Sequence, residues 1–193
     1  MDRLQKLEEQ VKALYQSDNP KRSEWAGWLA DNHVFVVADY ATELAKKHGA
    51  NEELARAAAL LHDIADVKMR RNDDKHEEES LTMARTLMQA AGYKDSEVEL
   101  VVDDAIRYHS CHEDERPESL EGQILSTADS MAHLKTDFYV FATWALGRDR
   151  TLADIKNWIL KKIERDINNK MFFDDVRQEV MPDYIRIKEL FSR

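Results

Sequence analysis

An all-α fold is predicted by two features of the sequence. The 193 residues include only five glycines and three prolines, so few positions interrupt regular structure. Apolar residues recur at intervals of three and four, and no segment alternates with the period of two that marks a β-strand. We therefore expect helices throughout the chain.

The apolar spacing assigns the helices in order. We expect them near 2–17, 24–48, 52–65, 79–91, 95–109, 119–135, 137–146, 151–168 and 175–191. Gly49, Gly92 and Gly147 each follow an apolar run, where a left-handed helix cap is typical. Thr151 and Asp154 resemble a capping box at the start of the eighth helix. The three prolines, including Pro182, are expected in the breaks between helices.

The apolar stripe of the first helix is short. Leu4, Leu7, Val11 and Leu14 form it, and this length favours packing onto the domain over a coiled coil. With neither a linker nor an internal repeat in the sequence, residues 1–193 are interpreted as a single domain.

Composition excludes several classes of function. The formal net charge of −10 argues against nonspecific binding to a nucleic acid polymer or an anionic membrane, since both need a basic surface. No apolar run approaches the ~20 residues that cross a bilayer. The charged start lacks the apolar segment of a secretory signal, so a cytoplasmic location is expected. Cys111 is the only cysteine, which rules out an internal disulfide and a cysteine-rich zinc site, and we interpret it as a bystander.

Four polar residues stand on faces that otherwise belong to a core: His33, His62, Asp63 and Asp129. A lone histidine on such a face is commonly a hydrogen-bonded core residue, but a buried carboxylate needs a cation or several hydrogen bonds. No lysine or arginine shares those faces to neutralise the two acids. Two imidazoles and two carboxylates suit a divalent ion such as Mn, Fe, Co, Ni or Mg, with open positions for water or substrate.

The ordered set resembles a known signature. His33, then "AALLHD" ending at Asp63, then "STADSM" around Asp129, is similar to the H…HD…D pattern of the HD-domain metal-dependent phosphohydrolases. The resemblance covers about residues 30 to 135. It implies an all-helical HD core at about 24–135 with a helical extension over 137–193. It also implies a divalent metal held by those four residues and hydrolysis of a phosphomonoester or phosphoanhydride, commonly in a nucleotide.

One departure narrows the resemblance. Ala65 replaces the glycine of the HDIG subgroup, which weakens an assignment to the signalling phosphodiesterases of that subgroup.

Residues that follow the HD pair suggest how catalysis would be completed. Asp66 occupies the acidic position of an HDxxE/D pattern and is a candidate general acid or base; the alternative is a solvent-exposed carboxylate at the end of a helix. In the segment "VKMRRNDDKH", Lys68 and Lys75 are candidate catalytic cations, and Arg70 and Arg71 are candidate substrate ligands. The alternative is a solvated basic loop.

Two further histidines lie between the HD pair and the last aspartate. In two-metal members of the family, residues like His76 and His109 bind a second ion that the HD aspartate, here Asp63, bridges. Otherwise His76 and His109 would contact substrate phosphate or orient the metal ligands. His112, Glu113 and Asp114 are candidates for a rim or lid.

The leading hypothesis is a metal-dependent phosphohydrolase of a small phosphorylated metabolite, above all a nucleotide. Aromatic residues that could stack on a base are Trp25, Trp28, Tyr108 and Phe138, although aromatics at helical spacing commonly belong to the core. The alternatives are a cyclic-nucleotide or alarmone hydrolase, a di-iron oxygenase, and a non-catalytic helical module that retains a metal.

Overall fold

The structure, a computed structural model, describes residues 2–112 and 115–193, and it is all-α within them. The predicted fold class is confirmed, since these residues contain no β-strand. The α-helices are α1 (Arg3–Gln16), α2 (Ala26–Leu29), α3 (Phe35–His48), α4 (Glu52–Leu61), α5 (His76–Ala91), α6 (Asp95–Val98), α7 (Leu120–Lys135), α8 (Phe138–Leu146), α9 (Leu152–Asn168) and α10 (Asp174–Ser192). Two π-helical turns, Ala30–Val34 and Glu99–Ile106, and a 3₁₀ turn, Ile64–Val67, complete them.

Three of the predicted helix caps are confirmed, and the predictions for Gly147 and Pro182 are wrong. Gly49 and Gly92 adopt left-handed backbone angles, with φ of 78° and 101°, and Thr151 caps α9 by accepting from the Asp154 amide. Gly147 is right-handed, with φ of −62°, so the predicted left-handed cap is wrong there. Glycine instead permits a close approach, because a Cβ would lie 3.0 Å from the Thr143 carbonyl. Pro182 lies inside α10, not in a break; it is exposed, so water can solvate the carbonyl whose hydrogen bond proline removes.

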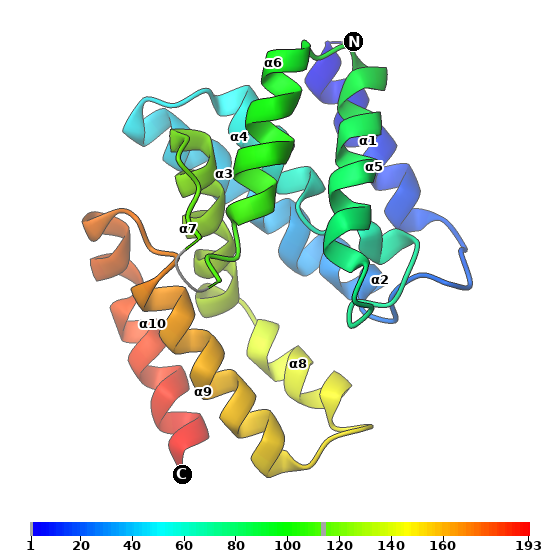
Figure 1. The fold of residues 1–193 in the computed structure, drawn as a ribbon. Coiled ribbons are helices and arrows are strands. Elements are labelled where there is room, and N and C mark those ends of the chain that lie inside the picture. The colour runs from blue at the N-terminus through cyan, green and yellow to red at the C-terminus, as the bar shows by residue number, and fades with distance from the viewer. Residues whose placement is uncertain (1, 113–114) are drawn as a thin grey trace.

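The helices form two neighbouring groups (Figure 1). Helices α3, α4 and α7 pack against one another, α1 packs against α4, and α5 packs against α1. Helices α8, α9 and α10 lie together below the end of α7 in that view, and each of them also contacts α7. Helix α7 therefore carries Asp129 between the two groups.

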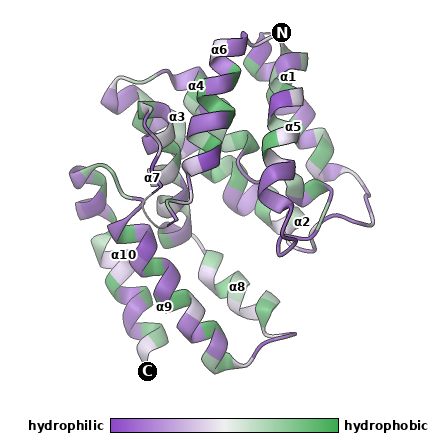
Figure 2. Ribbon diagram, in the orientation of Figure 1, coloured by the Kyte–Doolittle hydropathy of each residue, from purple (hydrophilic) through white to green (hydrophobic). Residues whose placement is uncertain are grey.

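Buried apolar residues join both groups in one core. Four alanines of α4, residues 55 and 57–59, are fully buried and allow a close approach of α3 and α7. Hydrophobic and hydrophilic residues alternate along α9 in Figure 2, and the apolar members Ile155, Ile159 and Ile163 are buried in this core. Across the described residues, no helix has the length and apolar character needed to span a membrane.

Two irregular turns position the polar residues of interest. His33 lies in the π-helical turn that leads into α3. Helix α4 ends at Leu61, and Asp63 leaves the helical region with φ of −119° and ψ of 25°. The predicted helix over 52–65 therefore continues too far, and the predicted helix over 79–91 starts too late, since α5 begins at His76.

Candidate metal and anion site

Three of the four predicted metal ligands meet at one point. The Nε2 atom of His33 lies 3.1 Å from Asp129 Oδ1 and 3.3 Å from His62 Nε2. One ligand atom from each of these three buried residues lies within 4.8 Å of the other two. Helices α4 and α7 and the π-helical turn thus bring together residues that are far apart in sequence.

The ring orientation of His62 leaves one nitrogen for a metal. Its Nδ1 lies 2.7 Å from the Ala59 carbonyl, to which an Nδ1 proton would be donated. The Nε2 lone pair is then directed toward the cluster, the arrangement common among metal-ligating histidines. Two imidazole nitrogens and a carboxylate oxygen, all buried, form a donor set that fits a divalent cation.

Asp63 lies at the edge of this cluster. Its Oδ2 is 3.3 Å from His62 Nε2 and accepts a hydrogen bond of 2.6 Å from Arg71. Burial opposes ionisation of Asp63, but the charges of Arg71 and His62 outweigh it and hold the pKa of the carboxyl well below its usual range. Asp63 is therefore ionised beside His62, but it is not among the three residues whose ligand atoms lie within 4.8 Å of one another.

Asp66 is buried behind Arg71. The Arg71 guanidinium donates to both Asp63 and Asp66, and the other Asp66 oxygen lies 3.1 Å from His76 Nε2. The alternative of a solvent-exposed carboxylate is excluded, because Asp66 is fully buried. The 3₁₀ turn directs Asp66 inward although the α-helix has ended.

The basic segment after the HD pair is exposed. Lys68 and Arg70 line the large cavity described below, and Lys68 also forms an ion pair with Glu79. Lys75 is exposed and does not line that cavity. The catalytic and substrate-binding roles of these three residues stay predictions.

Asp63, His76 and His109 line a smaller cavity of about 300 Å³. The Nδ1 atom of His109 lies 2.6 Å from the Ile106 carbonyl, so its Nε2 is the nitrogen free to bind a ligand. Burial, and then the charge of Lys170, lower the pKa of His109 to about 3. These three residues share a cavity wall, but Arg71 also lines it.

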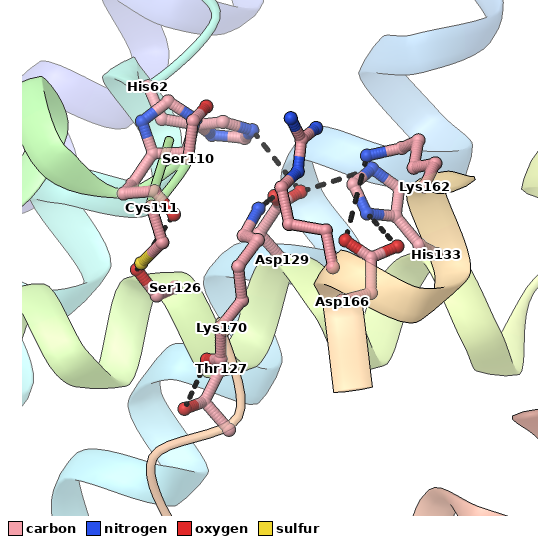
Figure 3. A network of polar contacts seen from close by, with 12 residues as sticks. His62, Ser110, Cys111, Ser126, Thr127, Asp129, His133, Lys162, Asp166 and Lys170 are labelled. Carbon is pink, nitrogen blue, oxygen red and sulfur yellow. Dashed lines mark hydrogen bonds and ion pairs between the residues drawn. The ribbon is translucent and has the colours of Figure 1, made fainter. Parts of the chain in front are cut away.

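The proposed rim is described only in part. His112 contacts the guanidinium of Arg165, with Nδ1 3.0 Å from a guanidinium nitrogen. Glu113 and Asp114 lie outside the described residues. Cys111 is buried, and its thiol contacts Ser126 at 3.5 Å, away from the cluster, as Figure 3 shows.

The structure supplies the cations that the sequence seemed to lack. The ammonium group of Lys170, in the segment after α9, pairs with Asp129 Oδ2, and Arg71 pairs with Asp63. The expectation that no lysine or arginine neutralises the two acids is therefore wrong, because both cations come from outside the helices that carry those acids. Burial opposes the charge of Lys170, but Asp129 and Asp166 outweigh it and raise its pKa.

A chain of polar contacts extends from Asp129 into the C-terminal helices (Figure 3). His133, one turn along α7, has Nε2 at 3.3 Å from Asp129 Oδ1 and Nδ1 at 3.3 Å from Asp166 Oδ2. Asp166 also accepts a hydrogen bond of 2.7 Å from the Tyr139 hydroxyl. Its Oδ1 lies 3.7 Å from the ammonium group of Lys162.

The sequence analysis did not predict this series of polar contacts, although two features of the sequence indicate it. His133 follows Asp129 by four residues and so shares its helix face. Asp166 follows the buried Ile163 by three residues, which places a carboxylate on an apolar stripe. Lys170 carries no comparable signal.

Asp129 of the cluster lines a cavity of about 1400 Å³, together with Asp63 and His133. Among the lining residues, nine are lysine or arginine and five are aspartate or glutamate. They come from the segment 19–25, the loop after the HD pair, α7, and α8 and α9 with their flanking segments. The cavity is thus cationic in a chain of net charge −10, and it suits an anionic ligand.

Comparison with known proteins agrees with this geometry. A family model described as HD domain matches residues 30–134. Ribonuclease Y of Aster yellows witches'-broom phytoplasma is 34% identical over 100 residues, which cover 52% of this chain and 17% of that protein. The chain therefore spans about a sixth of the length of that curated relative.

Solved structures are similar over nearly the whole chain. The selenomethionine form of YpgQ from Bacillus subtilis has a TM-score of 0.71 at 20% identity, covering 98% of this chain and 90% of that one. YpgQ in complex with ADP has a TM-score of 0.67 at 22% identity, covering 97% and 94%. A predicted HD superfamily hydrolase from an uncultured Thermotogales bacterium has a TM-score of 0.61 at 23% identity, covering 100% and 91%.

The match over residues 30–134 includes His33, His62, Asp63 and Asp129, and it covers more than half of the 193 residues. The fold and the buried cluster are those expected from that match. This chain belongs to the HD domain family.

Proposed function

We propose that this protein is a metal-dependent phosphohydrolase that cleaves a phosphoester or phosphoanhydride bond of a small phosphorylated metabolite, a nucleotide in particular. The observation that carries the proposal is the buried cluster of His33, His62 and Asp129 at the wall of a cationic cavity. A divalent ion and a surplus of lysine and arginine side chains together suit phosphate oxygens.

Two observations support a nucleotide. The structure of YpgQ in complex with ADP is similar to this chain over 97% of its length. Trp25, Phe138 and Trp158 line the cavity and offer aromatic surface for a base.

In this proposal His33, His62, Asp63 and Asp129 hold the divalent ion. When bound, such an ion polarises a phosphoryl oxygen and lowers the pKa of a coordinated water. Any of Mn, Co, Ni, Mg or Fe suits this donor set, and a second ion would use Asp63, His76 and His109. The shared cavity wall of those three residues supports the second position.

The remaining roles belong to the side chains around that point. Arg71, half-buried and paired with Asp63 and Asp66, orients both carboxylates and presents a cation to the substrate. Asp66 exchanges a proton with the reacting groups, and its contact with His76 at 3.1 Å keeps a second proton acceptor beside it. Lys68 and Arg70 contribute positive charge to the cavity, Lys75 is a catalytic candidate outside it, and His76 and His109 contact phosphate when no second ion is present. A cytoplasmic location stays part of the proposal.

A metal-dependent screen tests the proposal. The purified protein is analysed for bound metal and then assayed on a panel of phosphorylated metabolites with Mn, Co, Ni and Mg. We expect hydrolysis that is lost in both His62→Ala and Asp63→Ala. His48→Ala is the matched control, because His48 stacks on Phe173 and lines neither cavity.

Other outcomes would separate the alternatives. Bound metal without turnover of any phosphate compound would support the non-catalytic module and overturn the proposal. Two irons per chain with oxygen consumption would support the oxygenase. Turnover confined to cyclic nucleotides or alarmones would support the hydrolases of those compounds.

A further inference from the structure

The cations of the large cavity differ in how they are compensated. On the side of the HD pair, Arg71 is held by two carboxylates and Lys68 is paired with Glu79. Lys170 is paired with Asp129. These three charges are already balanced by acids of the protein.

The cavity side of α9 is different. The Arg165 guanidinium contacts the imidazole of His112, which carries no negative charge; burial, and then the Arg165 charge, lower the pKa of His112. Within residues 2–112 and 115–193, Arg165 forms no ion pair, and its buried Nε has no hydrogen-bond partner. Among the residues that the structure describes, Arg165 is thus a half-buried cation without an ion-pair partner.

Lys162 lies one helical turn earlier on the same face. Its side chain is 11% exposed, and its acidic neighbour at 3.7 Å is Asp166, whose oxygens are also approached by Tyr139 and His133. Burial, and then the charges of Lys170 and Arg165, lower the pKa of Lys162 to about 8, although Asp166 and Asp129 oppose the shift. A desolvated cation that is compensated this weakly attracts an anion strongly.

The position of these two cations relative to the cluster is defined by the polar chain. Lys162 is linked to Asp129 through Asp166 and His133, so one carboxylate and one imidazole separate it from the metal-binding end. Figure 3 shows Lys162, Asp166 and His133 on one side of Asp129 and His62 on the other. Both ends face the same cavity.

We propose that Lys162 and Arg165 form an anion subsite on α9 that binds a second phosphate group of the substrate, beyond the phosphate that reacts at the cluster of His33, His62 and Asp129. This inference rests on the proposed function and narrows the substrate to compounds with at least two phosphate groups. A monophosphate would fill the reacting position and leave Lys162 and Arg165 without a ligand.

The affinities of two inorganic probes test the subsite by a readout other than activity. Full-length protein is titrated calorimetrically, in saturating Mg, with pyrophosphate and with orthophosphate. We expect wild type to bind pyrophosphate at least about tenfold more tightly. Lys162→Met and Arg165→Gln should each weaken pyrophosphate binding by about tenfold and orthophosphate binding by less than about threefold.

Matched variants keep the test decisive. Lys161→Met makes the same chemical change at an exposed neighbour outside the cavity and should leave both affinities unchanged. If circular dichroism shows that Lys162→Met is unfolded, Lys162→Arg keeps the charge and should retain the preference for pyrophosphate, whereas Arg165→Gln should still lose it. Equal weakening of both probes in Arg165→Gln, or no preference in wild type, would overturn the subsite. A wild-type protein that prefers pyrophosphate but hydrolyses nothing would reject the proposed function and leave the subsite intact.

Discussion

The two walls of the large cavity reach charge balance in different ways. On the HD-core wall, the acids and their cation are close in sequence: Asp63, Asp66 and Arg71 lie within nine residues of one another. On the C-terminal wall, Asp129 of α7 meets Lys170 and the His133–Asp166 pair across helices. The first wall is assembled by one local segment, and the second exists only after α9 has docked on α7.

This difference separates two physical roles. The contacts among Asp63, Asp66 and Arg71 involve no residue of the C-terminal extension. Docking of α9 determines the electrostatic environment of the predicted metal ligand Asp129. Substitutions on the two walls should therefore have different signatures, and the following predictions are ordered by the size of the expected effect.

Asp129 belongs to both walls, and Asp129→Asn should have the largest effect. A neutral amide is a poor ligand for a divalent ion, so we expect loss of bound metal and a fall in kcat/KM on the order of 1,000-fold or more. Elemental analysis and steady-state kinetics measure the two quantities. Asp137→Asn, at an exposed position before α8, should change neither. A metal-loaded, active Asp129→Asn protein would remove Asp129 from the ligand set.

Lys170→Met tests the C-terminal wall alone. It leaves the buried Asp129 without its cation, so the free energy of unfolding at pH 7 should fall by about 3–5 kcal/mol. Added Mn should restore part of that loss, because the ion supplies the missing positive charge, and ligand at 100 times Kd stabilises by about 2.7 kcal/mol. Urea titrations with and without Mn measure both effects. Lys161→Met is the control, with a change of less than about 0.5 kcal/mol. A loss that Mn leaves undiminished would contradict this account of Asp129.

The pH dependence of stability compares one histidine beside each wall. Burial lowers the pKa of His109 and of His133 to about 3 in the folded protein. The unfolded chain, with histidine pKa values of ~6.5, binds more protons below that pH. The contribution of each neutral histidine to the free energy of unfolding is therefore complete above pH ~6.5. It is lost as pH falls toward 3, at up to about 1.4 kcal/mol per pH unit for each histidine.

Urea unfolding between pH 7.5 and 5 measures this slope in metal-free protein. The slope of the free energy of unfolding against pH should be shallower in His109→Gln than in wild type, because one titrating group is removed. A wild-type stability that is flat over this range would show that neither histidine is held neutral by burial.

The exposed basic segment should give the smallest effect. Lys75 is outside the cavity, and Lys75→Ala should change kcat/KM by less than about twofold; Lys68→Ala, which faces the cavity but is paired with Glu79, should reduce it a few-fold. Steady-state kinetics at low and high salt measures both. A hundredfold loss in Lys75→Ala would instead support the catalytic role predicted from the sequence.

The residues of the HD-core wall could be predicted from the sequence better than those of the C-terminal wall. The helical fold and the cluster of His33, His62 and Asp129 were accessible, because apolar periodicity and ordered polar exceptions are local properties of the sequence. The sequence predicted the acidic position of Asp66 but not its burial. The burial depends on a 3₁₀ turn that the spacing of apolar residues does not predict. The pairing of Lys170 could not be predicted from the sequence, because its partner Asp129 is 41 residues away and the ion pair forms only when α9 is docked on α7.

The π-helical turn at Ala30–Val34 has a consequence for insertions and deletions. Such a turn holds one residue more than an α-helical turn, and that surplus sets the direction in which His33 leaves the backbone. Removing the exposed Asn32 would shorten the segment to ordinary α-helix and change the direction in which His33 leaves the backbone. The chain would then keep every ligand in its sequence and still lose the convergence of His33 with His62 and Asp129, through a single codon.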